Sequence, residues 1–441
     1  MDGIQGGTRY DEVYADWKRD PEGYWRKAAG GIAWDTPPAR MFDASMGVYG
    51  RWFPGGRLNT CFNAVDRHVA AGRGAQPAII WDSPMTGRIE TLTYAQLQTR
   101  VAKLAGALAA RGVARGERVV IYMPMVPEAA IAMLACARLG AVHSVVFGGF
   151  AAAELAARIA DAKPRAIISA SCGLEPGRVV KYKPLLDAAI ALSPHKPDAV
   201  LILQREQSPC DLTPGRDEDL LAAESAADPH PCVSVESTDP LYILYTSGTT
   251  GAPKGILRDN GGHAVALHHS MSLVYGVGAG DVYWAASDVG WVVGHSYIVY
   301  APLLAGCTTV IFEGKPVGTP DAGTFWRVCA QHGVKVLFTA PTAIRAIKKE
   351  DPDGTFLKRH DLSKLEALYL AGERCDPDTI TWSQRLLQKP VVDHWWQTET
   401  GWTITGNFRG LGLFPTRPGS GGKAAPGYDV VVLDEAGQEV P

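Results

Sequence analysis

A segment that is rich in glycine, hydroxyl side chains and lysine follows a predicted strand near the middle of the chain. It covers residues 245–255 and comes after a run of β-branched and aromatic residues. Glycines let backbone N–H groups approach phosphate oxygens closely, hydroxyl groups add donors, and lysine adds a mobile positive charge. A loop that binds the outer phosphates of ATP needs these groups. The candidate phosphate ligands are Thr246, Ser247, Gly248, Thr249, Thr250, Gly251 and Lys254.

This loop is not a Walker A motif, which has glycine directly before the lysine and Ser or Thr directly after it. Here Pro253 precedes Lys254 and Gly255 follows it. The alternative interpretation is a flexible surface loop without a ligand. The preceding strand and the density of hydroxyl groups favour phosphate binding.

A second polar segment, residues 393–399, begins at the end of another predicted strand. Open α/β sheets bind their ligands beyond the carboxyl ends of their strands, so this segment is placed to contact a nucleotide. Glu399 offers the carboxylate that Mg²⁺ favours as a ligand. A solvated surface carboxylate is the alternative for this residue.

Strand and helix patterns alternate through most of the chain, which predicts an α/β fold with mainly parallel sheets covered on both faces. Helices are expected over 94–111 and 127–139. Strands are expected over 77–81, 118–123, 141–147, 165–169, 199–203, 241–245, 282–286, 308–312, 334–338, 367–370 and 391–393. The pattern suggests two similar α/β lobes.

The expected division of the chain has four parts. Residues 1–60, rich in Trp, Gly and Pro, form an extended segment that wraps on a larger body and is anchored by tryptophans. Residues 61–240 form the first lobe, and residues 241–408 form the second. Residues 409–441 begin a small β-rich subdomain: a Gly- and Pro-rich loop leads to a strand over 429–433 and a turn, and the chain looks cut at Pro441.

Composition narrows the function classes. The hydrophobic fraction is 46% and the charged fraction 20%, as in ordinary soluble proteins. The net charge of −3 argues against a nucleic-acid binder. No apolar run of about 18 residues predicts a membrane span, and the N-terminus lacks the apolar core of a signal peptide. The eight scattered cysteines include no Cys-x-x-Cys pair, so we expect reduced thiols in a cytoplasmic protein.

The loop at 245–255 resembles the signature of the adenylate-forming ligase superfamily, which includes acyl-CoA synthetases, luciferases and peptide-synthetase adenylation domains. Segments 287–297, 339–346 and 393–401 resemble its short-chain branch, the acetyl- and propionyl-CoA synthetases. The Trp-rich N-terminal segment with residues 63–68 is similar to the same branch. The resemblance extends, in order, over nearly the whole chain.

The resemblance implies an enzyme that joins a small carboxylate to ATP, releases pyrophosphate and transfers the acyl group to coenzyme A, with Mg²⁺ as cofactor. Thr246, Lys254 and a Mg²⁺ ion held by Glu399 would neutralise the triphosphate. Arg178 would contact the coenzyme A nucleotide, although a surface arginine without a ligand is the alternative. The residues implied at the adenine and α-phosphate are Gly372, Glu373, Arg374, Asp393, His394, Trp395, Gln397 and Thr398. Arg374 replaces a proline of the family, which leaves its role open.

By the same resemblance, the acyl pocket consists of Trp291, Val292, Val293, Gly294, Ala371 and Trp396. A rigid indole such as Trp396 can close a cavity, which implies a very short acid. Trp395 and Trp396 should point to opposite faces of an extended segment. His295 and His394 are interpreted as pocket-lining or hydrogen-bonding residues, because the substrate is already a carboxylate at pH 7 and needs no base.

Acetyl-CoA synthetases carry Val where this chain has Ala371 and Thr where it has Val293. Both differences enlarge the pocket or make it more apolar, so propionate is the expected acid. An acetyl-CoA synthetase and a non-catalytic nucleotide- or acyl-adenylate-binding fragment are the alternatives. The oligomeric state is not predicted.

Members of the family continue into the rest of the β-rich subdomain, which supplies a ribose-binding Asp. A small mobile C-terminal domain then supplies a Lys for adenylation. The resemblance therefore implies that residues 1–441 are the large N-terminal part of such an enzyme. We expect this part to bind nucleotide and acid but to be severely impaired in turnover.

Overall fold

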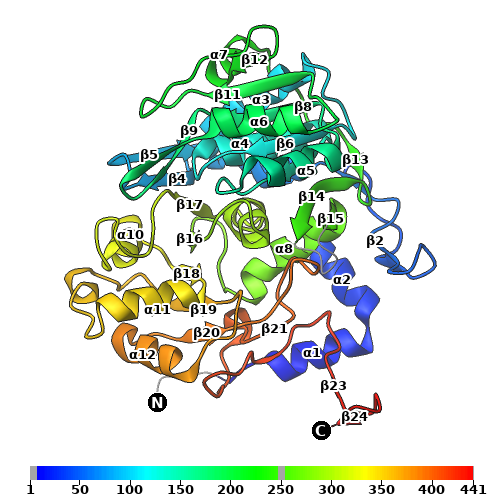
Figure 1. Cartoon of the computed structure of the whole chain (residues 1–441). Coiled ribbons are helices and arrows are strands. Elements are labelled where there is room, and N and C mark those ends of the chain that lie inside the picture. Colours follow the sequence, from blue (N-terminus) through cyan, green and yellow to red (C-terminus); the bar gives the residue numbers. More distant parts are fainter. Residues whose placement is uncertain (1–6, 247–253, 441) are drawn as a thin grey trace.

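The computed structural model describes residues 7–246 and 254–440, and these residues form two seven-stranded, mainly parallel sheets with helices packed against them (Figure 1). This confirms the predicted α/β class. The first sheet has the order β12 (Asp217–Asp219), β11 (Ala199–Leu203), β8 (Ala166–Ala170), β6 (Arg118–Tyr122), β7 (Val142–Val145), β14 (Pro240–Thr246) and β15 (Lys254–Asp259). The second has the order β20 (Val391–Asp393), β19 (Ala367–Leu370), β18 (Val336–Thr339), β16 (Val282–Ala285), β17 (Thr308–Phe312), β4 (Pro77–Ser83) and β5 (Arg88–Thr93).

The helices lie mainly in the connections between parallel strands, because a parallel pair needs a crossover segment. They are α3 (Tyr94–Ala109), α4 (Pro127–Leu139), α5 (Ala152–Ala162), α6 (Tyr182–Leu192), α7 (Leu220–Ala226), α8 (Gly261–Leu273), α9 (Ala301–Leu304), α10 (Thr324–His332), α11 (Pro341–Glu350) and α12 (Pro377–Leu387). Short helical turns are η1 (Phe62–Asp66), η2 (Val69–Arg73), η3 (Gly294–Tyr300), η4 (Leu357–Arg359) and η5 (Arg409–Leu411). Helix α4 is buried on nearly all sides, and the core around it contains residues of both sheets.

The two sheets exchange strands, which the expected division at residue 240 did not foresee. Strands β4 and β5 come early in the chain but complete the second sheet, where β4 pairs in parallel with β17. Strands β14 and β15 come late but complete the first sheet. Residues 61–240 and 241–408 therefore do not correspond to the two sheets. The reason is that β4 carries the apolar run 78–81, which is buried beside β17, and sequence distance does not show this pairing.

The N-terminal segment corrects a second expectation, because much of it is helical rather than extended. Helix α1 (Tyr10–Arg19) is followed by α2 (Pro21–Ala29), whose first turn is capped by the side chain of Asp20 on Gly23 N–H. Trp17 and Trp25 are buried as anchors, as expected. Among its described residues, 7–60, the other regular elements are the two-residue strands β1 (Phe42–Asp43), β2 (Arg51–Trp52) and β3 (Arg57–Leu58).

The N-terminal helices lie against the C-terminal part of the chain, as Figure 1 shows at α1 and β21 (Thr405–Gly406). The hydroxyl of Tyr10 donates to the Ala424 carbonyl at 2.7 Å, and that of Tyr14 donates to the Tyr428 carbonyl at 3.0 Å. These contacts join the two ends of the described chain.

The C-terminal part is mostly irregular, as predicted for residues 409–427. The expected strand over 429–433 is shorter, because only β23 (Val432–Leu433) pairs, with β24 (Glu439–Val440). Further short strands are β9 (Cys172–Glu175), β10 (Arg178–Lys181), β13 (Val235–Glu236) and β22 (Lys423–Ala424). Among the helices of the described residues, none has the length and apolar character needed to cross a membrane.

Candidate functional site

The predicted phosphate loop is the connection of a β-hairpin. Strand β14 ends at Thr246 and the antiparallel strand β15 begins at Lys254, and these two residues face each other in register. Lys254 is exposed and Thr246 half-buried. The remaining loop candidates, Ser247, Gly248, Thr249, Thr250 and Gly251, lie outside the described residues. The hairpin itself was not predicted.

Two other predicted segments meet at the carboxyl ends of β19 and β20. Leu370 and Asp393 lie opposite each other in these parallel strands, and His394 N–H donates to the Leu370 carbonyl at 3.0 Å. Residues 371–374 and 393–399 therefore leave the sheet side by side, which confirms the placement inferred from the strand ends. Burial raises the pKa of Asp393 to about 6, so this carboxyl is still mainly ionised at pH 7.

Glu373 is fixed by helix α11. Its carboxylate accepts the Thr342 N–H at 2.7 Å and pairs with Arg345 at 2.7 Å. Burial alone would raise the pKa of Glu373, but the hydrogen bonds from Thr342 and Arg345 hold it below its usual value. Gly372 has φ +102°, a conformation that favours glycine, and Arg374 is exposed. The side chain of Arg374, whose role the sequence leaves open, is therefore solvated.

Arg258 of β15 holds the loop that carries Glu399, and sequence reasoning missed it. Its Nη2 donates to the carbonyls of Thr398 at 2.7 Å and Glu399 at 2.9 Å, and its Nη1 donates to that of Thr400 at 3.3 Å. The strand that begins at Lys254 therefore also positions the predicted Mg²⁺ ligand. Arg258 lies outside every motif, and its only signal was a cation on a strand that directly follows the loop.

The acyl pocket prediction is consistent with one apolar cluster. Trp396 is 8% exposed and Ala371 is 5% exposed. The Trp396 ring meets Tyr297 edge-on at 5.4 Å between centroids and lies 6.3 Å from Phe338. Val292 and Val293 are half-buried and pack against the same core. Trp395 is 47% exposed, so the two neighbouring indoles point to opposite sides as alternation predicted.

Gly294 and Trp291 differ in how they relate to this cluster. A Cβ at Gly294 would lie 2.2 Å from the Asp288 carbonyl oxygen and 2.4 Å from Val289 Cα, so the close backbone approach requires glycine. Trp291 is 48% exposed, and its ring lies 5.5 Å from that of Phe147. Trp291 therefore does not join the buried acyl cluster with Trp396, because its indole packs on a residue beyond β7 instead.

His295 and His394 are buried and have structural partners, which supports their non-catalytic interpretation. A ring nitrogen of His295 contacts the Trp291 carbonyl at 3.0 Å. His394 contacts the Leu370 carbonyl at 2.8 Å and the Tyr275 hydroxyl at 3.0 Å. Burial lowers the pKa of each to about 4, so both imidazoles are neutral at pH 7.

Arg178 lines a cavity of about 280 Å³ between the β9–β10 hairpin and the ends of β16 and β17. Gly148, Gly173, Glu175, Asp288 and Lys315 share this cavity. A larger cavity, of about 800 Å³, is lined by Glu399, Arg258, Trp402 and the N-terminal Trp25. Arg178 and Glu399 thus line two different cavities.

Comparison with known protein families agrees with this architecture. Residues 66–441 match the family described as AMP-binding enzyme, and residues 10–64 match the family described as acetyl-coenzyme A synthetase N-terminus. The chain belongs to the AMP-binding enzyme family, within the adenylate-forming superfamily that its motifs resemble.

The similar curated proteins point to the short-chain branch. The chain is 52% identical to a human protein named acyl-CoA synthetase short-chain family member 3, mitochondrial, over 98% of this chain and 64% of that protein. It is 47% identical to the propionate–CoA ligase of Escherichia coli, over 97% of this chain and 68% of that protein. An uncharacterised protein of Pseudomonas aeruginosa is 56% identical over 95% of this chain. The chain spans about two thirds of the length of these relatives.

Proposed function

We propose that the protein activates a short-chain carboxylate, preferably propionate, by forming an acyl-adenylate from ATP and transferring the acyl group to coenzyme A. The observation that carries this proposal is the meeting of two segments at the ends of β19 and β20. There the buried side chains of Ala371 and Trp396, which we propose line the acyl pocket, adjoin the polar segment that ends at Glu399. The names of the similar human and E. coli proteins support the same chemistry.

In the first step, a carboxylate oxygen bonds to the α-phosphorus of ATP and the bond to pyrophosphate breaks. Two anions must meet, so the protein contributes mainly by positioning and by neutralising charge. Thr246 lies where the phosphate loop leaves the sheet at the end of β14, and Lys254 lies where the loop re-enters it at the start of β15. Neutral His295 and His394 have no proton to move, because the attacking group is already ionised.

The residues at the Glu399 loop fit a divalent cation. The Glu399 side chain is exposed while its backbone is held by Arg258, so an oxygen ligand of the type that Mg²⁺ favours is presented in a fixed place. When bound, Mg²⁺ would neutralise phosphate charge. Glu399 would hold it.

The second step needs a place for coenzyme A, and the cavity at Arg178 supports one. Arg178 is exposed at its rim, and an arginine there can bind a phosphate through two parallel hydrogen bonds. Attack of the coenzyme thiol on the acyl carbonyl would release AMP.

Propionate-dependent ATP–pyrophosphate exchange tests this function, because exchange requires a reversibly formed acyl-adenylate. For residues 1–441 we expect exchange that is slow, in line with the impaired turnover expected above, and that needs both propionate and Mg²⁺. Calorimetric binding of AMP without exchange on either propionate or acetate would instead identify a nucleotide-binding module. Equal exchange rates with propionate and acetate would support adenylation but would contradict a preference for propionate.

Selectivity for propionate is expected to depend on Ala371. We expect kcat/KM for propionate to exceed that for acetate by about tenfold or more, within the range of methylene discrimination in apolar pockets. Ala371→Val should reduce this ratio towards one, because the added methyl groups fill the space that a third carbon needs, and a buried CH₂ is worth about 0.8 kcal/mol. The matched control is Ala191→Val on the exposed face of α6, which should keep the wild-type ratio. An unchanged ratio in Ala371→Val would exclude Ala371 from the acyl pocket.

A further inference from the structure

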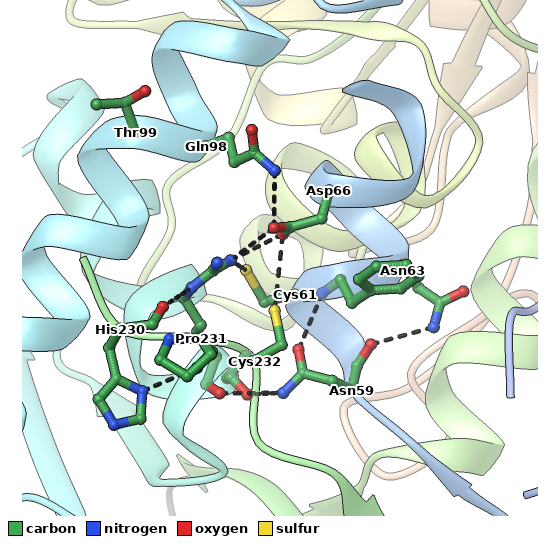
Figure 2. A network of polar contacts seen from close by, with 12 residues as sticks. Asn59, Cys61, Asn63, Asp66, Gln98, Thr99, His230, Pro231 and Cys232 are labelled. Carbon is green, nitrogen blue, oxygen red and sulfur yellow. Dashed lines mark hydrogen bonds and ion pairs between the residues drawn. The ribbon is translucent and has the colours of Figure 1, made fainter. Parts of the chain in front are cut away.

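Two cysteines from distant parts of the sequence lie together beside a buried ion pair, and none of these residues belongs to the site described above (Figure 2). Cys61 directly precedes η1 and is fully buried, whereas Cys232 lies in the connection between α7 and β13 and is half-buried. The two sulfurs and a carboxylate oxygen of Asp66 all lie within 4.8 Å of one another. Cys232 is therefore the member of the pair with solvent-exposed surface.

A divalent metal ion is not the favoured occupant of this cluster, although two thiolates and a carboxylate could ligate one. Arg138 already takes that place. Its Nη1 contacts both Asp66 oxygens, at 2.8 and 3.0 Å, and lies 3.9 Å from Cys61 Sγ. A metal ion would have to displace this buried guanidinium, which leaves an uncompensated charge. The charge of Arg138 favours the Cys61 thiolate, but burial outweighs this effect and raises the pKa of Cys61.

The backbone on both sides of Cys232 is held in place. The His230 carbonyl accepts a hydrogen bond from Arg138 Nε at 2.6 Å. Val233 N–H donates to the Arg138 carbonyl at 2.8 Å, and the Val233 carbonyl accepts from the Asn59 side chain at 2.8 Å. These bonds hold Cys232 against the segment that carries Cys61, and the two sulfurs, which lie within 4.8 Å of each other, must approach to about 2.05 Å to bond.

We propose that Cys61 and Cys232 form a peroxide-responsive pair that closes to an intramolecular disulfide. The half-buried Cys232 reacts first. Its thiolate sulfur bonds to one peroxide oxygen, the O–O bond breaks, and the other oxygen leaves as water after taking a proton. Cys61 sulfur then bonds to Cys232 sulfur, and the S–O bond breaks with release of a second water. Two thiols and one hydrogen peroxide thus give one disulfide and two waters.

The groups around the pair fit this order of events. Cys232 Sγ lies 3.7 Å from Asp66 Oδ2, which can accept the thiol proton. Burial raises the pKa of Cys61 well above its ordinary value, so Cys61 is suited to the second step rather than to the first attack. Gln98 donates to the other Asp66 oxygen at 2.8 Å and keeps the carboxylate oriented.

The test is treatment of the protein with a small excess of hydrogen peroxide, followed by alkylation in denaturant, digestion and mass spectrometry. We expect free thiols to fall from eight to six and a Cys61–Cys232 peptide to appear that is lighter by two hydrogen atoms. Dithiothreitol should restore both thiols.

Variants separate this pair from general oxidation. In Cys61→Ser the linked peptide should disappear and dimedone should label Cys232, because the sulfenic acid then has no partner. The matched control, Cys210→Ser, removes another half-buried thiol and should keep the link. The proposal is overturned if wild-type Cys232 proceeds to sulfinic acid while Cys61 stays free. It is equally overturned if the purified protein carries one zinc ion that Cys61→Ser loses.

Discussion

Substitution of Arg258 by methionine is expected to lower propionate-dependent ATP–pyrophosphate exchange by about a hundredfold, because a shift of about 1 Å in a catalytic group costs that much. Arg258 donates to three successive carbonyls, those of Thr398, Glu399 and Thr400. Without these bonds the Glu399 loop loses its fixed position beside β15. The loss should fall mainly on kcat, since Ala371 and Trp396, which we propose line the acyl pocket, are not altered.

Two further variants sharpen this expectation. Arg258→Lys keeps the charge but lacks the planar fork that serves several acceptors, so its exchange rate should lie between those of the wild type and Arg258→Met. Arg385→Met removes an exposed arginine on α12 and should leave exchange unchanged. Circular dichroism and thermal melting show whether each variant is folded. Full exchange in folded Arg258→Met would mean that the loop does not need this clamp.

The largest loss of stability is expected from Glu313→Gln. Arg205, just after β11 of the first sheet, pairs with Glu313, just after β17 of the second, at 2.7 and 2.9 Å. Both side chains are buried, at 6% and 5% exposure. The substitution leaves the guanidinium charge without a counter-charge, which typically costs about 3–5 kcal/mol. Urea denaturation should report this as a lower free energy of unfolding.

The exposed ion pair of Arg88 and Glu206 provides the matched control. Its side chains are 58% and 73% exposed, so Glu206→Gln should change the free energy of unfolding by less than about 1 kcal/mol. Replacing both buried partners, as in Arg205→Met with Glu313→Leu, should recover much of the loss, because no lone charge remains. If Glu313→Gln proved as stable as Glu206→Gln, the Arg205–Glu313 ion pair would not contribute substantially to the stability of the packing between the two sheets.

The regular elements were predictable where one physical signal dominated. Helix α4 and strands β11, β17, β19 and β20 have the predicted bounds, because continuous apolar runs ended at clear turns. Strand β15 was missed because residues 254–259 hold three charged side chains and no long apolar run that would mark a buried strand. Helix α2 was missed because Pro21, Gly23 and Trp25 hide a helical start that Asp20 caps, and helix α1 has no side-chain cap to mark its start.

The candidate site was likewise predictable only where one physical signal dominated. The strand-end rule placed residues 393–399 at the edge of the sheet, the family resemblance placed residues 372–374 at the same site, and alternation separated Trp395 from Trp396. The exposure of Trp291 and its packing on Phe147 could not be predicted, because a motif fixes a residue's place in the chain but not the direction of its side chain. Arg258 could not be found, since its partners are carbonyls, which every residue has.

The exchange of strands between the two sheets has a consequence for how the chain folds during synthesis. Strands β4 and β5 leave the ribosome early, yet β4 must wait for β17, more than 200 residues later, before it has its parallel neighbour. The first sheet cannot add β14 until residue 240 has emerged. Pairings of such long sequence separation form slowly and leave hydrophobic edges uncovered in the meantime. We therefore expect nascent chains that end before β17 to depend on chaperones, whereas complete chains bury the β4 surface themselves.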